Sequence, residues 1–172
     1  RVLFRSNKPA VVPIKGSKSK SGITVKGIHD LAVRFSKCCS PVPGDEIVGF
    51  VTRGRGITIH RTDCINVLNL PEIERSRLID AEWQGVEEDN SAATYSTEIS
   101  IFANNRIGMF VDISKIFTER EIDIKTMNSR VNKQGKATIT MSFDIHGIEE
   151  LNNLMAKLRQ IDGVLDIERT TG

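Results

Sequence analysis

All three cysteines of this chain lie in one stretch, from Cys38 to Cys64, which reads CCSPVPGDEIVGFVTRGRGITIHRTDC. The stretch opens with two adjacent thiols, Cys38 and Cys39, and closes with His60 shortly before Cys64. Three sulfurs and one imidazole are the ligands of a closed tetrahedral zinc site. If these side chains bind one ion, the stretch must fold back on itself, which constrains the whole N-terminal half of the chain.

The residues between the paired cysteines and the histidine favour such a fold. Two short runs rich in β-branched residues, 46–51 and 57–60, flank the glycine-containing segment 52–56. This pattern predicts a β-hairpin. The hairpin would return His60 to the end of the stretch that carries Cys38.

Other interpretations fit the same residues. Free cysteines are often simply small, buried hydrophobic side chains, and Cys38 with Cys39 can instead form a vicinal disulfide or a redox-sensing pair. Asp63, next to Cys64, is an alternative fourth ligand or a hydrogen-bond acceptor for His60. On these residues alone, a structural zinc site and a metal-free cluster both stay open.

Charge divides the chain of 172 residues into two parts. Residues 1–84 carry 14 Lys and Arg against 8 Asp and Glu, whereas residues 85–172 carry 10 against 14. Such asymmetry indicates two domains with different partners. We expect a flexible basic linker, a small α/β module with the candidate zinc site, a polar linker and a second domain, over residues 1–27, 28–84, 85–93 and 94–172.

Within the first domain the pattern predicts several short elements. We expect a helix within 29–37, a helix over 63–69 that is capped by Thr62 or Asp63, and a last strand over 78–83. Residues 23–25 (ITV) can add one more short strand.

The second domain has a regular alternation of strands and amphipathic helices. The expected order is strand, helix, strand, strand, helix, strand, over residues 95–103, 108–120, 122–131, 136–145, 148–160 and 164–169. This βαββαβ order is the ferredoxin-like split unit, in which two helices cover one face of a four-stranded antiparallel sheet. The fold class is therefore α+β.

The motifs of common catalytic sites are absent from the sequence. It contains no P-loop, no G-x-S-x-G and no H-E-x-x-H pattern. A zinc ion with four protein ligands would also have no open position for a catalytic water. No apolar run is long enough to span a membrane, and three cysteines without a disulfide framework favour a reducing cytoplasm. We expect a non-enzymatic, cytoplasmic chain.

The cysteine-rich stretch resembles a known family. Its Cys-Cys-x-Pro-x-Pro-Gly-Asp opening, Gly-Arg-Gly turn and His-Arg-x-x-Cys close are similar to the conserved-cysteine, or zinc-finger, domain of long RelA/SpoT proteins. These bacterial stringent-response enzymes make, and often hydrolyse, (p)ppGpp. The resemblance extends over residues 28–172 and implies structural zinc at Cys38, Cys39, His60 and Cys64. It also implies that an ACT domain follows and that the parent is a GTP pyrophosphokinase whose catalytic domains lie elsewhere.

The resemblance further implies contact with the ribosome, through large-subunit rRNA. Arg53 and Arg55 in the hairpin turn and Arg61 beside the predicted zinc ligand match the family's positions. Arginines on a rigid scaffold suit phosphate and base-edge contacts. We expect these three residues to bind RNA, although a solvated turn with ordinary surface charge also explains them.

ACT domains often bind amino acids at the loop between the first strand and the first helix, commonly in dimers. Here the loop is Asn104-Asn105-Arg106-Ile107-Gly108, with Asn105 where the family often has Asp. A helix-capping turn explains the same residues. The expected partners are thus a branched-chain amino acid at this loop, a second copy of the chain, and the catalytic domains of the parent. The alternative functions are a redox-responsive dimerisation module and an amino-acid-sensing ACT module without RNA contact.

Overall fold

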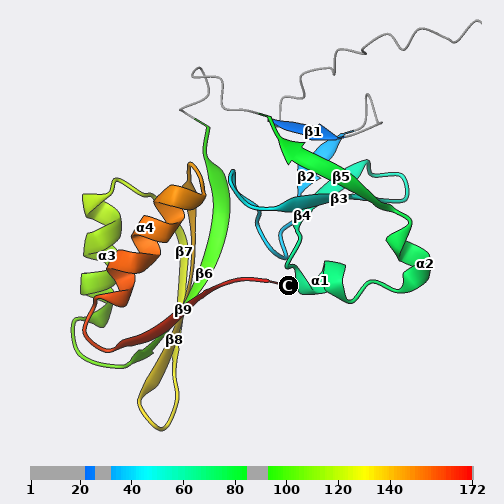
Figure 1. Ribbon diagram of the computed structural model, residues 1–172. Coiled ribbons are helices and arrows are strands. Elements are labelled where there is room, and N and C mark those ends of the chain that lie inside the picture. Colours follow the sequence, from blue (N-terminus) through cyan, green and yellow to red (C-terminus); the bar gives the residue numbers. More distant parts are fainter. Residues whose placement is uncertain (1–21, 26–31, 85–92, 172) are drawn as a thin grey trace, which may run out of the picture.

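A computed structural model describes residues 22–25, 32–84 and 93–171 of the chain. Within these residues the chain forms two sheets, each with its own hydrophobic core (Figure 1). We call the parts that carry them the N-terminal unit (described residues up to 84) and the C-terminal unit (93–171). Most of the expected linkers, 1–27 and 85–93, lies outside the described residues, although the strand expected at 23–25 is present.

The N-terminal unit has a mixed sheet with strand order β1-β5-β3-β4-β2. All neighbouring strands are antiparallel except β2 and β4, which are parallel. The predicted hairpin and last strand are confirmed. The elements are β1 (Ile23–Val25), β2 (Val33–Phe35), β3 (Ile47–Val51), β4 (Ile57–Arg61), α1 (Ile65–Leu68), α2 (Glu72–Arg75) and β5 (Leu78–Trp83).

The prediction of a helix within 29–37 was wrong for residues 32–37, the part of this range that the structure describes. Val33–Phe35 forms β2, an edge strand beside β4, and the backbone carbonyl of Ala32 accepts a hydrogen bond from the N–H of Ile57. Val33 and Phe35 are half-buried while Arg34 is exposed. This alternation is that of a strand. The segment forms a strand rather than a helix because it pairs with β4, a partner that the local sequence pattern does not reveal.

The second half of the N-terminal unit also differs in detail from the prediction. Cys64, rather than Thr62 or Asp63, is the N-cap residue of α1, and no side chain caps the helix. The short helix α2 lies in a segment for which we predicted no helix or strand. Both helices have four residues, too few for a reliable amphipathic pattern in the sequence.

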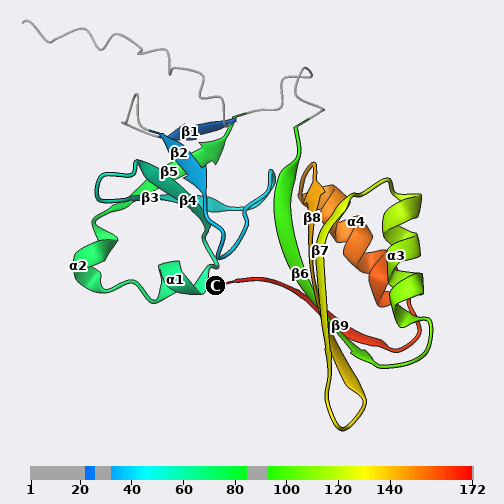
Figure 2. The ribbon, with the colours of Figure 1, turned by 180° about the vertical axis from the view of Figure 1, so that it is seen from behind.

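The C-terminal unit has the predicted βαββαβ order. Its four strands are antiparallel in the order β7-β8-β6-β9, and both of its helices cover the face turned away from the N-terminal unit (Figures 1 and 2). Strand β8 alternates regularly between buried and more exposed residues. The elements are β6 (Tyr95–Asn104), α3 (Met109–Glu119), β7 (Ile124–Val131), β8 (Lys136–Ile145), α4 (Ile148–Arg159) and β9 (Val164–Arg169).

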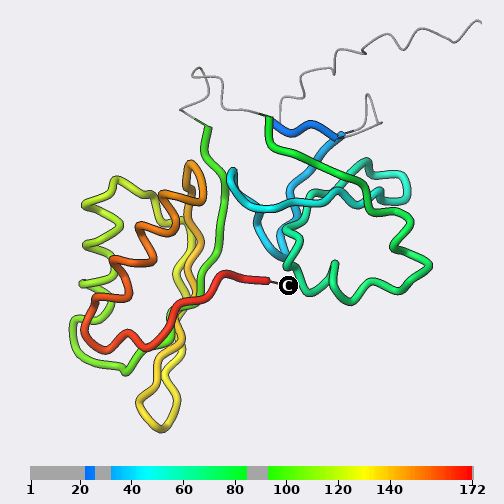
Figure 3. Tube along the Cα trace, in the orientation of Figure 1, coloured from blue at the N-terminus to red at the C-terminus, as the bar shows by residue number. Residues whose placement is uncertain are grey.

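The two units are joined by several contacts. Val42, which precedes β3, is fully buried in the core of the C-terminal unit. Tyr95 at the start of β6 makes edge-to-face contacts with both Phe35 and Trp83, which stack on each other. After β9 the chain leaves the C-terminal sheet and reaches the start of α1 (Figure 3).

Candidate functional site

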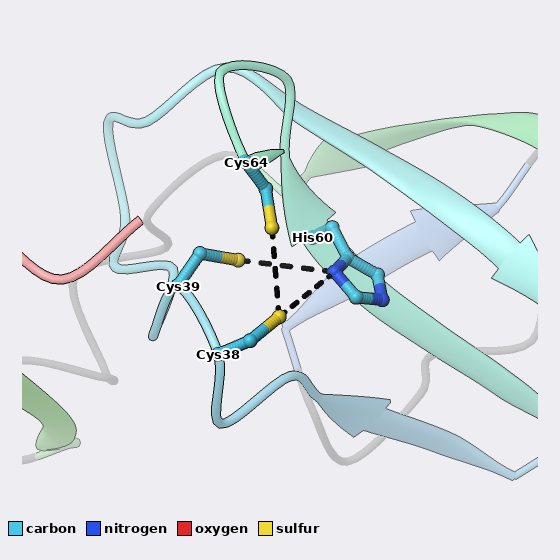
Figure 4. A group of neighbouring side chains, drawn as sticks. All are labelled: Cys38, Cys39, His60 and Cys64. Carbon is cyan, nitrogen blue, oxygen red and sulfur yellow. Dashed lines mark hydrogen bonds between the residues drawn. The ribbon is translucent and has the colours of Figure 1, made fainter. Parts of the chain in front are cut away.

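Cys38, Cys39, His60 and Cys64 come together in the structure. One sulfur or ring-nitrogen atom from each residue lies within 4.8 Å of the others. The three sulfurs and His60 Nδ1 point toward a common centre (Figure 4). All three cysteines are free thiols rather than disulfides.

The fold of the N-terminal unit explains this convergence. Along β4 the side chains of Ile57, Ile59 and Arg61 are buried, so His60 projects to the opposite side of the strand. The chain turns directly after β4, and Cys64 is the residue immediately before α1. The paired cysteines follow β2, which lies beside β4, and so they reach the same end of the sheet.

The geometry fits a tetrahedral metal ion. Cys38 Sγ lies 3.5 Å from Cys64 Sγ and 3.4 Å from His60 Nδ1, and Cys39 Sγ lies 3.9 Å from the same nitrogen. Zinc holds sulfur at about 2.3 Å and nitrogen at about 2.0–2.1 Å, which in a tetrahedral site separates neighbouring ligand atoms by roughly 3.5–3.8 Å. The four residues thus could hold a metal ion, and zinc suits this donor set.

Burial and hydrogen bonds adjust the ionisation of these groups. Burial, helped by the nearby Cys64 and Cys38 sulfurs, raises the pKa of the Cys39 thiol from 9.0 to about 12, although the hydrogen bond from the backbone N–H of Arg61 acts in the opposite direction. Burial also raises the pKa of Cys38, but hydrogen bonds from Ser36 and Asn66 outweigh it and lower the net value. Burial lowers the pKa of His60, which favours the neutral imidazole that a metal requires.

Ser36 and Asn66 are members of the site that sequence reasoning missed. Ser36 Oγ lies 2.7 Å from Cys38 Sγ, and Asn66 is near enough to help lower the pKa of the Cys38 thiol. Hydrogen bonds of this kind orient metal ligands and tune their basicity. The motif letters alone did not single out either residue, because each reaches the sulfur only after β2 and α1 have formed.

Arg61 does not lie on the exposed surface where we expected it. It is 6% exposed. Its guanidinium donates to both carboxylate oxygens of Asp63 and to the backbone carbonyls of Cys39 and Thr170. We therefore remove Arg61 from the expected RNA contacts. Asp63 is committed to this ion pair and is not among the four converging residues.

Arg53 and Arg55 are exposed in the turn between β3 and β4. The Arg53 side chain is 85% exposed, and its Nη2 lies 3.5 Å from a carboxylate oxygen of Glu74. An exposed ion pair of this length is weak. Both guanidinium groups thus stay accessible to a partner.

The Asn104–Gly108 loop is a connection in which the side chains of Asn104 and Arg106 are already engaged. Arg106 donates to the Asp112 carboxylate and to the carbonyls of Asp162 and Ile107, and Asn104 Oδ1 accepts a hydrogen bond from Lys136. Gly108 begins α3 with φ 83°, and no side chain caps the helix. The N–H of Met109 donates to the carbonyl of Arg106, so the N–H groups that follow it in the first turn of α3 are the ones that suit a carboxylate.

Two family models match the chain in succession. The RelA/SpoT RIS domain matches residues 23–84, and the ACT domain matches residues 91–169. In the part of the chain that the structure describes, no helix is long and apolar enough to cross a membrane.

Curated relatives match over most of the chain. The GTP pyrophosphokinase of Escherichia coli (strain K12) is 36% identical over 161 residues, which is 93% of this chain and 21% of the relative. That of Haemophilus influenzae is 34% identical over 166 residues, or 95% and 22%, and that of Streptomyces coelicolor is 31% identical over 150 residues, or 87% and 17%. The chain thus spans about a fifth of the length of these relatives.

Among solved structures, the ACT domain from GTP pyrophosphokinase of Chlorobium tepidum aligns with a TM-score of 0.41 and 26% identity, over 45% of this chain and 99% of that one. The two domain models and the curated relatives lead to one conclusion: the chain belongs to the RelA/SpoT family, as a RIS domain followed by an ACT domain that matches a C-terminal regulatory region.

Proposed function

We propose that this chain is a non-catalytic regulatory fragment of a (p)ppGpp synthetase/hydrolase and that structural zinc stabilises its RIS domain. The observation that carries this proposal is the convergence of Cys38, Cys39, His60 and Cys64. Four protein ligands fill a tetrahedral ion and leave no position for a reactive water. Such a site contributes to folding rather than to chemistry, because metal binding is coupled to formation of the site.

The zinc site supports a role for the neighbouring hairpin in RNA binding. His60 lies near the open end of the β3–β4 hairpin, and the turn at the opposite end presents Arg53 and Arg55 to solvent. A metal that fixes one end of a hairpin restricts the motion of its tip. We propose that these two arginines contact the phosphates of large-subunit ribosomal RNA, as the RelA/SpoT family assignment suggests.

In this proposal the fragment reports ribosome contact and amino-acid starvation to catalytic domains that lie outside the chain. The chain covers about a fifth of relatives named GTP pyrophosphokinase, so that activity is proposed for the parent protein, and hydrolysis of (p)ppGpp is a further possibility there. Thiol ligands for zinc also suit a reducing cytoplasm.

The RNA contact is tested with isolated large ribosomal subunits. Arg53→Glu with Arg55→Glu should weaken binding on the order of 10-fold or more and should flatten its salt dependence. The matched control is Lys115→Glu with Lys157→Glu, two exposed cations on α3 and α4, which changes net charge equally. Equal loss in both double variants, or no loss in either, contradicts a specific contact through the hairpin.

A second candidate is binding of a branched-chain amino acid at the Asn104–Gly108 loop. The uncapped first turn of α3 supports it, because N–H groups at a helix start bind carboxylates. Isothermal calorimetry with valine, leucine or isoleucine is the test. Absence of both heat and a thermal shift excludes this candidate.

A further inference from the structure

The segment from Cys38 to Asp45, which we call the docking loop, has two sets of contacts. At its start Cys38 and Cys39 belong to the candidate metal centre. At its end Val42 is 0% exposed and packs among side chains of the ACT core, including those of β6, β8 and α4. The same eight-residue loop therefore connects the metal centre to the ACT domain.

An ion pair fixes the far end of the docking loop. Arg169, at the end of β9, donates to both carboxylate oxygens of Asp45 at 2.7 and 2.8 Å. The two side chains are only 11% and 9% exposed. Arg169 also donates to the carbonyl of Ser40, one residue after the metal-binding pair. A two-point Arg–carboxylate pair of this kind is geometrically specific.

The other two ligand positions also adjoin contacts with the ACT domain. Arg61, next to His60, donates to the carbonyl of Thr170. The N–H of Ile65, next to Cys64, donates to the carbonyl of Thr171 at 2.8 Å. Both acceptors lie just beyond β9. Each segment that supplies a metal ligand thus has a residue nearby that forms a hydrogen bond with the end of the ACT domain.

We infer that metal binding at Cys38, Cys39, His60 and Cys64 and docking of the ACT domain on the RIS domain are thermodynamically coupled through the docking loop and Arg169. A metal ion that ties both ends of the Cys38–Cys64 stretch together orders the loop in the shape that Val42 and Asp45 need for docking. In return, the docked ACT domain holds the loop in the shape that binds metal, because coupling between two binding events is reciprocal. The inference rests on the proposed zinc site.

The decisive test places the substitution in the ACT domain, away from every ligand. Arg169→Glu puts a second carboxylate beside Asp45 and should release the ACT domain. We expect its dissociation constant for zinc, measured by competition with a chelator, to rise on the order of 10-fold. Arg130→Glu is the matched control, because Arg130 is exposed on β7 and the substitution changes the net charge by the same amount. This variant should bind zinc as tightly as the unsubstituted chain does. Arg169→Lys should give an intermediate value.

The effect of zinc binding on docking of the ACT domain can be followed with a side chain of the protein itself. Trp83 is the chain's one tryptophan, packs against Tyr95 of the ACT domain and donates its indole N–H to the carbonyl of Asp45. Removal of zinc should shift Trp83 emission to longer wavelength and increase the radius of gyration in small-angle X-ray scattering. Far-ultraviolet circular dichroism of Arg169→Glu checks that the ACT sheet remains folded.

The possible failures are distinguishable. Unchanged zinc affinity in Arg169→Glu overturns the coupling, whether or not the ACT domain is released, and so do unchanged emission and radius of gyration after zinc removal. Absence of zinc from the purified parent chain refutes the metal centre itself, which is a failure of the proposed function.

Discussion

Gly44 and Ile148 are in direct contact across the two domains. Gly44 has φ 100°, and a Cβ atom at this position would lie 2.2 Å from Cγ2 of Ile148. The carbonyl of the preceding residue, Pro43, accepts a hydrogen bond from the N–H of Ile148 at 2.8 Å. The first turn of α4 in the ACT domain therefore rests on a glycine of the RIS domain, and a larger residue does not fit without movement.

Gly44→Ala should be more destabilising than an otherwise similar glycine substitution. The matched control is Gly54→Ala, because Gly54 has φ 81° but nothing within 4 Å of its would-be Cβ. Both variants carry the strain of a left-handed alanine, about 1–2 kcal/mol. Gly44→Ala adds a steric conflict of about 1–3 kcal/mol. Urea unfolding followed by Trp83 emission measures the free energy of unfolding of each.

Equal destabilisation of the two glycine variants would show that Ile148 moves aside at little cost. That result would contradict a close-packed contact between the docking loop and α4.

The candidate metal centre predicts a selective effect of histidine substitution. The purified, reduced chain should contain about one zinc per molecule, and His60→Asn should lose it because only three ligands remain. His146→Asn is the control, since His146 is exposed and bonded to Glu150 on α4. Elemental analysis with thiol titration measures both. A chain without metal and with three reactive thiols would instead favour redox-responsive dimerisation.

Alkaline pH should destabilise the metal-free chain through Cys39. Its folded pKa is raised to about 12, whereas the unfolded thiol titrates near 9.0. The folded state thus keeps a proton that the unfolded state releases, so this stability is present below pH 9.0 and is lost as the pH rises toward 12. Urea unfolding of chelator-treated wild type and Cys39→Ala across this range isolates the effect. A stability difference between them that does not change with pH contradicts it.

His60 should make the stability of the metal-free chain depend on pH in the acidic range. Burial lowers its pKa below 6.5, so the unfolded state takes up a proton that the folded state resists. The stability from neutral His60 is therefore present above pH 6.5 and is lost as the pH falls through the folded pKa. In metal-free His60→Asn this acid-dependent loss should be absent, and its persistence there would assign it to other groups.

Much of the fold follows from local pattern, and the exceptions have a common cause. The alternation in β6 and β8 and the helical spacing in α3 and α4 predicted the ACT domain to within a few residues. The sequence also singled out the four converging residues, because cysteine and histidine are uncommon and have few roles. Wrong or missing predictions depend on distant partners: β2 exists through its pairing with β4.

The residues that join the two domains were not predictable for the same reason. From the sequence, Val42 belongs to a proline-rich turn, and no neighbouring residue indicates that its side chain packs in the core of a different domain. Asp45 reads as a turn residue, and its partner Arg169 lies 124 positions away. Arg61 reads as a surface cation until its acceptors at Asp63, Cys39 and Thr170 are known.

Arg61 and Arg55 give opposite expectations although both are arginines of the same hairpin. Arg61→Ala removes a 6% exposed side chain and leaves the carbonyl of Cys39 without this donor, so we expect a loss of about 2–3 kcal/mol in the free energy of unfolding. Arg55→Ala, at an exposed position of the turn, should change it by no more than about 0.5 kcal/mol. Arg61→Lys should recover only part of the loss, because one ammonium cannot reproduce the planar guanidinium that contacts Asp63 at two points.

Urea unfolding of the three variants, with binding to the large ribosomal subunit measured under conditions where each variant is folded, separates an effect on stability from an effect on RNA contact. If Arg61→Ala is as stable as wild type yet binds ribosomal subunits more weakly, Arg61 is a contact residue after all and its buried position in the free chain is not the one that meets RNA.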